Sequence, residues 1–365
     1  MSYKTYLVML SVSAFGAFWL TPFAAWLARR CGAMDLPDKR KVHSRPMPRL
    51  GGVAVYLGFL LPWAGLYLLH NPVASEFKNY ERAFFTLVLG ATAMFSLGVY
   101  DDIKGADATK KFLVQTVIAI GLWVGGYRIE SFQNPLGDVI RLGWFGLPVT
   151  LLWIVGVTNA INLLDGIDGL VSGVAVCMAI ALAVINALTG NVVVALLTVA
   201  LAGACLGFLP HNHSPARIFL GDSGSLTIGV VLSCVGIISL FKEHDHAASP
   251  LISVPLILFG LPLFDTLRVM FKRWRRGVSV FHADKSHVHH RLLLLGFNHR
   301  QASWLLYGVA FVTGTFAVLL IAVGIDRQIQ LSVLFALLAL LAAGVVAIWK
   351  FRVRAAFAKK EEPVD

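Results

Sequence analysis

Two long apolar runs of this chain are separated by the polar stretch Asn159-Ala-Ile-Asn162-Leu-Leu-Asp165-Gly166-Ile-Asp168-Gly169-Leu170. Its two amides and two carboxylates recur every three residues, a spacing that follows one slowly drifting face of a helix. Its glycines allow a turn and a close approach of backbone or ligand. Acceptor oxygens beside amides at a membrane edge suit a hydrated cation and the polar groups that it carries. Taken alone, the stretch is as typical of a polar loop that caps the next helix.

The composition is that of a membrane protein. Of the 365 residues, 57% are hydrophobic and 14% charged, and the mean hydropathy is +0.74. These values predict an all-α, polytopic membrane protein with about eleven transmembrane helices, ten being the alternative count. We expect one integral-membrane domain over residues 1–350 and a charged cytoplasmic tail over 351–365. The apolar runs cover about 6–28, 50–69, 83–100, 112–127, 143–158, 170–188, 192–209, 219–240, 250–271, 303–324 and 331–349.

The distribution of Lys and Arg predicts the orientation. One set of loops holds 24 of the 31 Lys and Arg residues, and the other set, with the N-terminus, holds 7. By the positive-inside rule the first set is cytoplasmic, so the N-terminus lies outside and the C-terminus inside. The net charge of +11 then marks one membrane face, which suits anionic lipids and anionic substrates and not a nucleic acid. The cytoplasmic set comprises 28–50, 101–111, 159–168, 210–222, 265–302 and the tail from 350.

The first cytoplasmic loop is basic and rich in proline and glycine. These residues predict a defined loop that is neither helix nor strand. Its charges are typical of membrane anchoring, but Arg49 lies just before the pair Gly51 and Gly52, separated from it by Leu50, at a helix start where a guanidinium can contact a phosphate. We expect Arg49 to bind substrate.

Two further cytoplasmic loops carry carboxylates. Asp101 and Asp102 end the third run, where the helix dipole disfavours negative charge unless a cation, a substrate or lysines such as Lys111 compensate. Asp222 opens the eighth run in Gly-Asp-Ser-Gly-Ser, a corner that can hold a cation beside a phosphate. A solvated turn and an ordinary N-cap are the alternatives.

The ninth run contains Pro255, Gly260 and Pro262, which predict a kink or a break in that helix. A basic amphipathic segment follows, suited to lie on lipid head groups. After it come His287, His289, His290 and Arg291. No fourth ligand with zinc spacing follows these histidines, so they better suit contacts to an anionic, sugar-bearing ligand.

All of these polar clusters fall on the predicted cytoplasmic face. No Asp, Glu, Lys, Arg or His lies in the middle of any assigned run, whereas transporters and channels usually place such groups at the midplane. The pattern favours an enzyme that joins a lipid substrate to a soluble anionic one over a lipid-linked transporter. It favours a receptor or scaffold least.

Five motifs, in order, resemble the polyprenyl-phosphate N-acetylhexosamine-1-phosphate transferases. They are the first loop, the Asp-Asp pair, the stretch from Asn159, the Gly-Asp-Ser-Gly-Ser corner and the segment Asp284-Lys-Ser-His-Val-His-His-Arg-Leu292. The resemblance spans residues 30–295 and implies a helical bundle of ten or eleven spans with a broken ninth helix. The His-x-His-His-Arg form is similar to the branch that uses N-acetylglucosamine for O-antigen, enterobacterial common antigen or wall teichoic acid. The related branch that makes peptidoglycan lipid I has a longer all-histidine signature, absent here.

The resemblance implies a reaction at the bacterial inner membrane. A UDP-N-acetylhexosamine and undecaprenyl phosphate would give the undecaprenyl-diphosphate sugar and UMP, with Mg²⁺ or alternatively Mn²⁺. N-acetylglucosamine is the expected sugar, another amino sugar the alternative. Membrane lipids are the expected surroundings, and a homodimer is left open, as is the choice between direct attack and an aspartyl-phosphate.

The resemblance also implies roles for individual residues. Asp222 and Asn162 match the metal ligands. Asp101, Asp102 and His287 are the candidate catalytic residues. Contacts to the two substrates are implied for Arg49, Lys111, Asn159, Asp165, Asp168, His289, His290 and Arg291.

The predicted topology can be tested by labelling. Cysteines introduced at Asp107 and at Lys285, in a chain whose four native cysteines are replaced, should not react with an impermeant thiol reagent added outside intact cells. Permeabilised cells provide the control, in which both positions should react. Labelling of either position from outside would contradict a shared cytoplasmic face.

Overall fold

A computed structural model of the chain describes residues 3–37, 45–68, 72–134, 138–241, 252–279 and 286–323, and positions 329 and 331. The eleventh predicted span, the tail over 351–365 and parts of the two basic loops lie outside the described residues.

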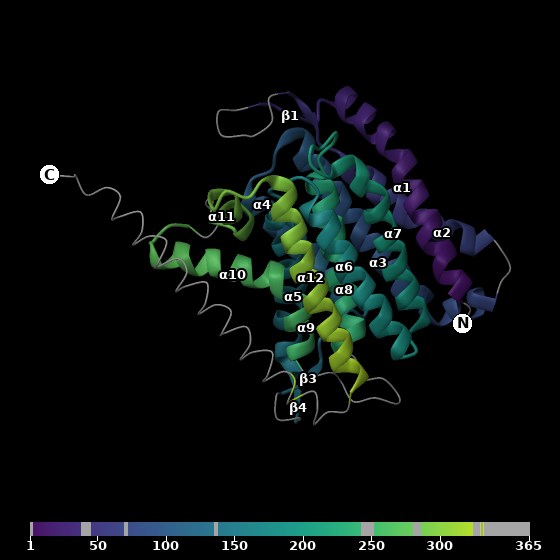
Figure 1. Cartoon of the computed structure of the whole chain (residues 1–365). Helices are drawn as coiled ribbons and strands as arrows, with labels where there is room; N and C mark the ends of the chain where they lie inside the picture. The colour runs from purple at the N-terminus through teal and green to yellow at the C-terminus, as the bar shows by residue number, and fades with distance from the viewer. Residues whose placement is uncertain are drawn as a thin grey trace.

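The described part is a bundle of long helices with two very short hairpins (Figure 1). A 3₁₀ turn over Gly143–Phe145 precedes the fifth helix. The helices are α1 (Tyr3–Cys31), α2 (Gly51–Leu68), α3 (Pro72–Lys104), α4 (Ala108–Val124), α5 (Gly146–Leu164), α6 (Leu170–Leu188), α7 (Val192–Asn212), α8 (Gly221–Phe241), α9 (Ser253–Leu258), α10 (Gly260–Arg275), α11 (Val288–Leu294) and α12 (His299–Ala322), and the strands are β1 (Met34–Asp35), β2 (Met47–Pro48), β3 (Ser131–Gln133) and β4 (Val139–Arg141).

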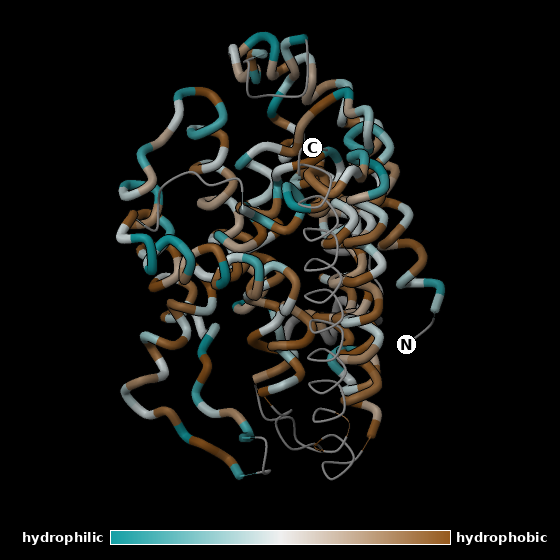
Figure 2. The backbone as a smooth tube through the Cα atoms, turned by 60° about the vertical axis from the view of Figure 1, so that its left-hand side comes forward, coloured by the Kyte–Doolittle hydropathy of each residue, from teal (hydrophilic) through white to brown (hydrophobic). Residues whose placement is uncertain are grey.

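The all-α, polytopic class is confirmed. Every predicted run that lies in the described residues coincides with a helix, and seven of these helices are long and apolar enough to cross a membrane. Hydrophobic residues dominate the long helices, and hydrophilic stretches lie mainly in the loops and towards the ends of the bundle (Figure 2). The count of eleven spans and the orientation stay predictions.

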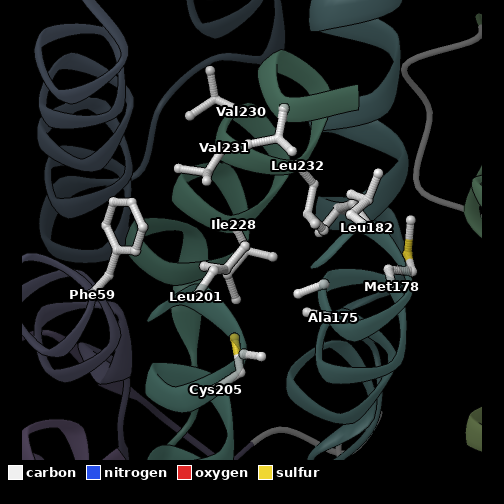
Figure 3. Packing of buried hydrophobic residues seen from close by; sticks show 14 of the residues in the cluster. Phe59, Ala175, Met178, Leu182, Leu201, Cys205, Ile228, Val230, Val231 and Leu232 are labelled. Atoms are coloured by element: carbon white, nitrogen blue, oxygen red, sulfur yellow. The ribbon is translucent and has the colours of Figure 1, made fainter. Parts of the chain in front are cut away.

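Helix α8 is the centre of the bundle. All of its residues except Asp222 are buried, and it packs against α2, α3, α5 and α6. Figure 3 shows its apolar side chains interlocked with those of α2, α6 and α7, among them Ile228, Leu201 and Leu182. A helix buried on all sides needs partners that approach closely, and its four glycines and four serines supply small surfaces for that.

Helix α1 lies along α7 and α2 (Figure 1). The contact uses Gly203 and Gly207 on α7, one turn apart, where a Cβ would run into the backbone of α1 at Leu10 and Ala14. The hydroxyl oxygen of Ser13 on α1 lies 2.7 Å from the carbonyl oxygen of Gly58 on α2 and 2.6 Å from that of Ala200 on α7, so either carbonyl can accept its one hydrogen bond. Small residues therefore bring the first helix within contact distance of two backbones.

The predicted break in the ninth helix is present. Helix α9 ends at Leu258 and α10 begins at Gly260, so that Phe259 is the joint between them. Pro262 lies in the first turn of α10, where a missing N–H leaves no helical hydrogen bond unmade. Beyond the break, α10 runs across the direction of the other helices instead of continuing along them (Figure 1).

The basic loop between α1 and α2 was predicted to contain no strand, and this is wrong. Strands β1 and β2 pair antiparallel, with Met34 opposite Pro48 and Asp35 opposite Met47. The pairing closes the loop at its base, and the Arg49 N–H donates to the Ala33 carbonyl at 3.0 Å. Prolines permit this because Pro48 lies at the end of a two-stranded ribbon, where a donor is not needed.

Figure 1 shows β1 and α11 at one end of the bundle and the β3–β4 hairpin at the opposite end. The loops that carry the sequence motifs meet at the first of these ends. Helix packing thus brings together segments from 49 to 299 in one place.

The close contact of α1 with α7 can be tested by Gly207→Ala. The added Cβ would overlap the Ala14 carbonyl, which is backbone and cannot rotate away, so we expect a loss of about 1–3 kcal/mol of stability. Thermal unfolding in detergent gives the measurement. Gly156→Ala is the matched control, because nothing lies within 4 Å of a Cβ at that helix position. Equal melting temperatures for the two variants would contradict the packing argument.

Candidate active site

Three carboxylates from two helices converge at the end of the bundle that carries the motifs. Asp101 and Asp102 end α3 and Asp222 begins α8, and one oxygen of each lies within 4.8 Å of the others. Among the described residues, this is the only group of His, Cys, Asp or Glu so arranged. The three histidines near residue 289 do not form such a group. Hard carboxylate oxygens at this spacing can hold a divalent cation such as Mg²⁺.

Two cations lie among the three carboxylates. Arg49 Nε is 3.1 Å from Asp102 Oδ1, and its Nη2 is 3.4 Å from Asp222 Oδ1. Lys111, from the start of α4, contacts Asp222 Oδ2 and lies 3.5 Å from Asp101 Oδ2. The two side chains offset the repulsion among the carboxylates, and both can contact a phosphate.

Asp102 differs from its neighbour Asp101 in what its oxygens accept. Its side chain is fully buried, and its two oxygens accept the backbone N–H groups of Asp222 at 2.8 Å and Ser223 at 2.9 Å. These are donors of the first turn of α8, which have no partner inside their own helix. Asp102 therefore joins the end of α3 to the start of α8, while Asp101 keeps an accessible edge.

The loop before α2 is joined to the loop before α8 by a short backbone ladder. The Phe219 N–H donates to the Pro48 carbonyl at 2.9 Å, and Gly51 and Gly52 donate to the carbonyls of Phe219 and Leu220 at 3.0 and 2.9 Å. Gly221 has a φ of +73°, and a Cβ there would lie 2.5 Å from both the Arg49 carbonyl and Asp102 Oδ2. Only glycine allows this approach, which places Arg49 over the carboxylates.

A cavity of about 590 Å³ opens beside Asp222. Its wall comes from the first loop, the stretch after Asn159, the loop between α7 and α8, and the two helices that follow the ninth span. The chemically active lining is Asp35, Arg49, Asn162, Asp165, Asp168, Asn212, Ser214, Asp222, His290 and His299. A site of this size and mixture suits a ligand as large as a nucleotide sugar.

Only part of the stretch that begins at Asn159 lines the cavity. Asn162 donates to Ser225 Oγ at 2.8 Å, so it offers its carbonyl oxygen to the cavity. Asn159, one turn deeper in α5, donates to Gln115 Oε1 on α4 and does not line the cavity. Asp168 accepts the Ala216 N–H at 3.1 Å, which fixes the cavity wall.

Asp165 follows the end of α5 and lines the cavity. Burial, together with the negative charge of Asp222, raises the pKa of Asp165 to about 8. At neutral pH the side chain is then mostly uncharged and can donate as well as accept a hydrogen bond.

The histidine loop covers the same stretch from the other side. His289 packs on Gly166 so closely that no Cβ would fit there, and His290 lines the cavity. The rings of His287 and His289 are parallel, with centroids 5.7 Å apart. Burial and the neighbouring histidines lower the pKa of His289 to about 3, so its imidazole is neutral at physiological pH. Arg291 follows His290 in α11 and is half-buried.

Comparison with known proteins supplies the family. Residues 84–240 match the model of glycosyl transferase family 4. The chain is 36% identical to a Bacillus subtilis probable undecaprenyl-phosphate N-acetylglucosaminyl 1-phosphate transferase over 86% of its own length and 84% of the relative's. It is also 36% identical to a Mycolicibacterium smegmatis decaprenyl-phosphate N-acetylglucosaminephosphotransferase, over 80% and 76% of the two chains. An Escherichia coli (strain K12) undecaprenyl-phosphate alpha-N-acetylglucosaminyl 1-phosphate transferase is 28% identical, over 85% and 82%.

The chain belongs to glycosyl transferase family 4. The family resemblance inferred from the five motifs is thereby confirmed. The roles of individual residues stay predictions. The structure brings Arg49, Lys111, Asp101, Asp102 and Asp222 into one cluster, and it places Asn162, Asp165, Asp168 and His290 around the adjoining cavity.

Three residues at the site of this family 4 protein were not predicted as site residues from the sequence motifs. Asp35 and His299 line the cavity, and the Nδ1 atom of His299 is buried without a hydrogen-bond partner. Asp265, which lies in the ninth predicted run, contacts His287. A carboxylate within an otherwise apolar and basic segment was the signal that singles out Asp265. His299 carries no such signal, since it begins an ordinary apolar helix.

Asp101 and Asp102 should respond differently to the same change. Asp102→Asn keeps one acceptor oxygen but places an amide NH₂ against one of the two backbone N–H donors, so we expect a loss of about 1–3 kcal/mol of stability together with loss of turnover. Asp101→Asn should lose turnover while keeping its melting temperature. Thermal unfolding and transfer assays on both variants make the test. Two variants with wild-type melting temperatures would contradict the joining role of Asp102.

Proposed function

We propose that this protein transfers N-acetylglucosamine-1-phosphate from UDP-N-acetylglucosamine to undecaprenyl phosphate, releasing UMP, at the cytoplasmic face of a bacterial inner membrane. The product would begin a lipid-linked cell-surface glycan such as O-antigen, common antigen or teichoic acid. Membership of family 4 and the names of the relatives support transfer of the sugar phosphate to a polyprenyl phosphate.

One observation carries the proposal: Asp222 both lines the cavity and contacts Lys111, which lies outside the cavity. The cavity that it lines is large enough for a nucleotide sugar. It also contacts Lys111 at the start of α4. Lys111 and its neighbour Asp101, at the end of α3, do not line the cavity. A soluble donor in the cavity and a lipid phosphate beside Lys111 would therefore share the carboxylate of Asp222.

The donor atoms present fit Mg²⁺. Asp222 and Asn162 are the proposed ligands, and both offer hard oxygens to the same cavity. Asp101 and Asp102 add negative charge within 4.8 Å. A bound Mg²⁺ would neutralise charge on the donor diphosphate and orient its phosphorus for attack.

The remaining chemistry needs positioning more than proton transfer. The second pKa of a phosphate monoester is about 6, so a lipid phosphate is already a nucleophile at neutral pH. Lys111 and Arg49 can draw two anions together, and Asp101 can orient the acceptor phosphate beside Lys111. Asp165, Asp168, His290 and Arg291 would hold the nucleotide sugar.

The assay that tests this proposal is UMP release from a panel of UDP-N-acetylhexosamines with undecaprenyl phosphate. We expect release that requires Mg²⁺ or Mn²⁺ and is fastest with UDP-N-acetylglucosamine. Asp222→Asn should lower turnover at least about 100-fold, since the charge on the cation site is lost.

Asp107→Asn is the matched control for that variant. Asp107 is an exposed carboxylate at the same end of the bundle and caps α4, a role that asparagine fills equally well. It should keep wild-type turnover. Absence of UMP release from every sugar in the panel would refute the proposed reaction, and a fully active Asp222→Asn would refute only the cation site.

A further inference from the structure

Asp265, on α10, is a buried carboxylate that belongs to none of the family motifs. It accepts three hydrogen bonds: from His287 Nδ1 at 2.8 Å, from the Val288 N–H at 2.9 Å and from Arg268 Nη2 at 3.3 Å. Arg268 also donates to the Ser286 carbonyl. The pair Asp265 and Arg268 therefore holds the chain on both sides of His287.

Asp265 reaches this position because the ninth span is broken. The break itself is anchored in the bundle, because Phe259 is fully buried and packs edge-on against Trp153 at 5.1 Å between centroids. The half after the break turns across the other helices (Figure 1). A continuous helix would keep Asp265 along the bundle axis, away from the histidine loop.

A line of contacts leads from Asp265 to the cavity. The ring of His287 lies parallel to that of His289, and His289 packs on Gly166 in the stretch after α5. His290, whose ring lies 4.3 Å from that of His289, lines the cavity directly. Asp265 does not line the cavity itself.

The hydrogen bond to Asp265 also selects the form of the His287 ring. A carboxylate accepts hydrogen bonds and donates none when ionised, so His287 presents Nδ1–H to it. In the neutral ring, Nε2 is then the acceptor, because the bond made by one ring nitrogen decides the state of the other.

We propose that Asp265 is the positioning residue of the histidine loop, acting through His287 to fix both the ring state of that histidine and the place of His289 and His290 against the donor cavity. The proposal rests on the proposed function. Asp265 touches neither substrate; its effect on transfer passes through His287.

Asp265→Asn is the informative change, since it keeps the shape of the side chain. The asparagine oxygen can still accept from Val288 and Arg268, while its NH₂ faces His287 Nδ1 and forces the proton to Nε2. We expect turnover to fall about 10- to 100-fold, the KM for the UDP-sugar to rise, and the melting temperature to stay near that of the wild type. Thr266→Val, at the neighbouring buried polar position on α10, is the control and should keep wild-type kinetics.

A double-mutant cycle separates positioning from a merely structural role. If Asp265 acts through His287, adding Asp265→Asn to His287→Ala should lower turnover by no more than about twofold further. Losses that multiply would overturn the proposal, and so would a fully active Asp265→Asn.

A spectroscopic measurement tests the same proposal without activity. In protein labelled with ¹⁵N-histidine, the His287 signals are assigned by their loss in His287→Gln. We expect the Nδ1–H form in the wild type and the Nε2–H form in Asp265→Asn. If the ring state of His287 is the same in the wild type and in Asp265→Asn, the proposal is overturned, whatever the rate of UMP release. If the ring state changes but the wild-type protein releases no UMP, the positioning role of Asp265 is supported and the proposed reaction is refuted.

Discussion

Three carboxylates confined within 4.8 Å of one another at the edge of an apolar bundle repel one another strongly, because burial removes the water that would screen them. The structure meets this constraint with two cations and a helix start. Arg49 and Lys111 lie between the carboxylates, and Asp102 accepts the first free N–H groups of α8. Each of these groups comes from a different segment, so the cluster exists only when the first loop, α3, α4 and α8 are all in place. The negative charge that remains at Asp101 and Asp222 can be offset by a bound cation.

The helical bundle serves this cluster through small residues. Helix α8 carries Asp222 and is buried along its whole length, which requires neighbours to approach its glycines and serines closely. Gly98 on α3 shows how close this approach is, because a Cβ there would overlap the backbone of α8 at Asp222 and Ser223. Contacts as close as this fix the height of α3 against α8, and with it the position of Asp101 and Asp102 relative to Asp222. Packing of this kind leaves little freedom for the site to relax.

The broken ninth span gives the protein a second support for its site. A helix that crossed the membrane without interruption would offer only apolar side chains to its neighbours, whereas α10 turns away and places Asp265 and Arg268 on the histidine loop. The cavity wall opposite Asp222 thus depends on a helix that is not part of the main bundle. Helix α10 and the cavity are joined through the rings of His287, His289 and His290.

Much of this protein follows from its sequence alone, because a membrane restricts a chain to few choices. Ten of the apolar runs coincide with helices in the described residues, the ninth run with the two helices α9 and α10. Prolines at 255 and 262 located the break, and the five motifs indicated the family. Charged residues of the carboxylate cluster, such as Asp222 and Lys111, are also visible in the sequence, because they interrupt apolar or glycine-rich stretches. Other features could not be read in this way. The pairing of β1 with β2, the different tasks of Asp101 and Asp102, and the contacts of His299 and Asp265 depend on which segments meet. Arg49 and Asp222, which contact each other, are 173 residues apart in the chain. Their meeting is decided by the packing of glycines against backbone on α8, a three-dimensional fit that no local pattern of residues encodes.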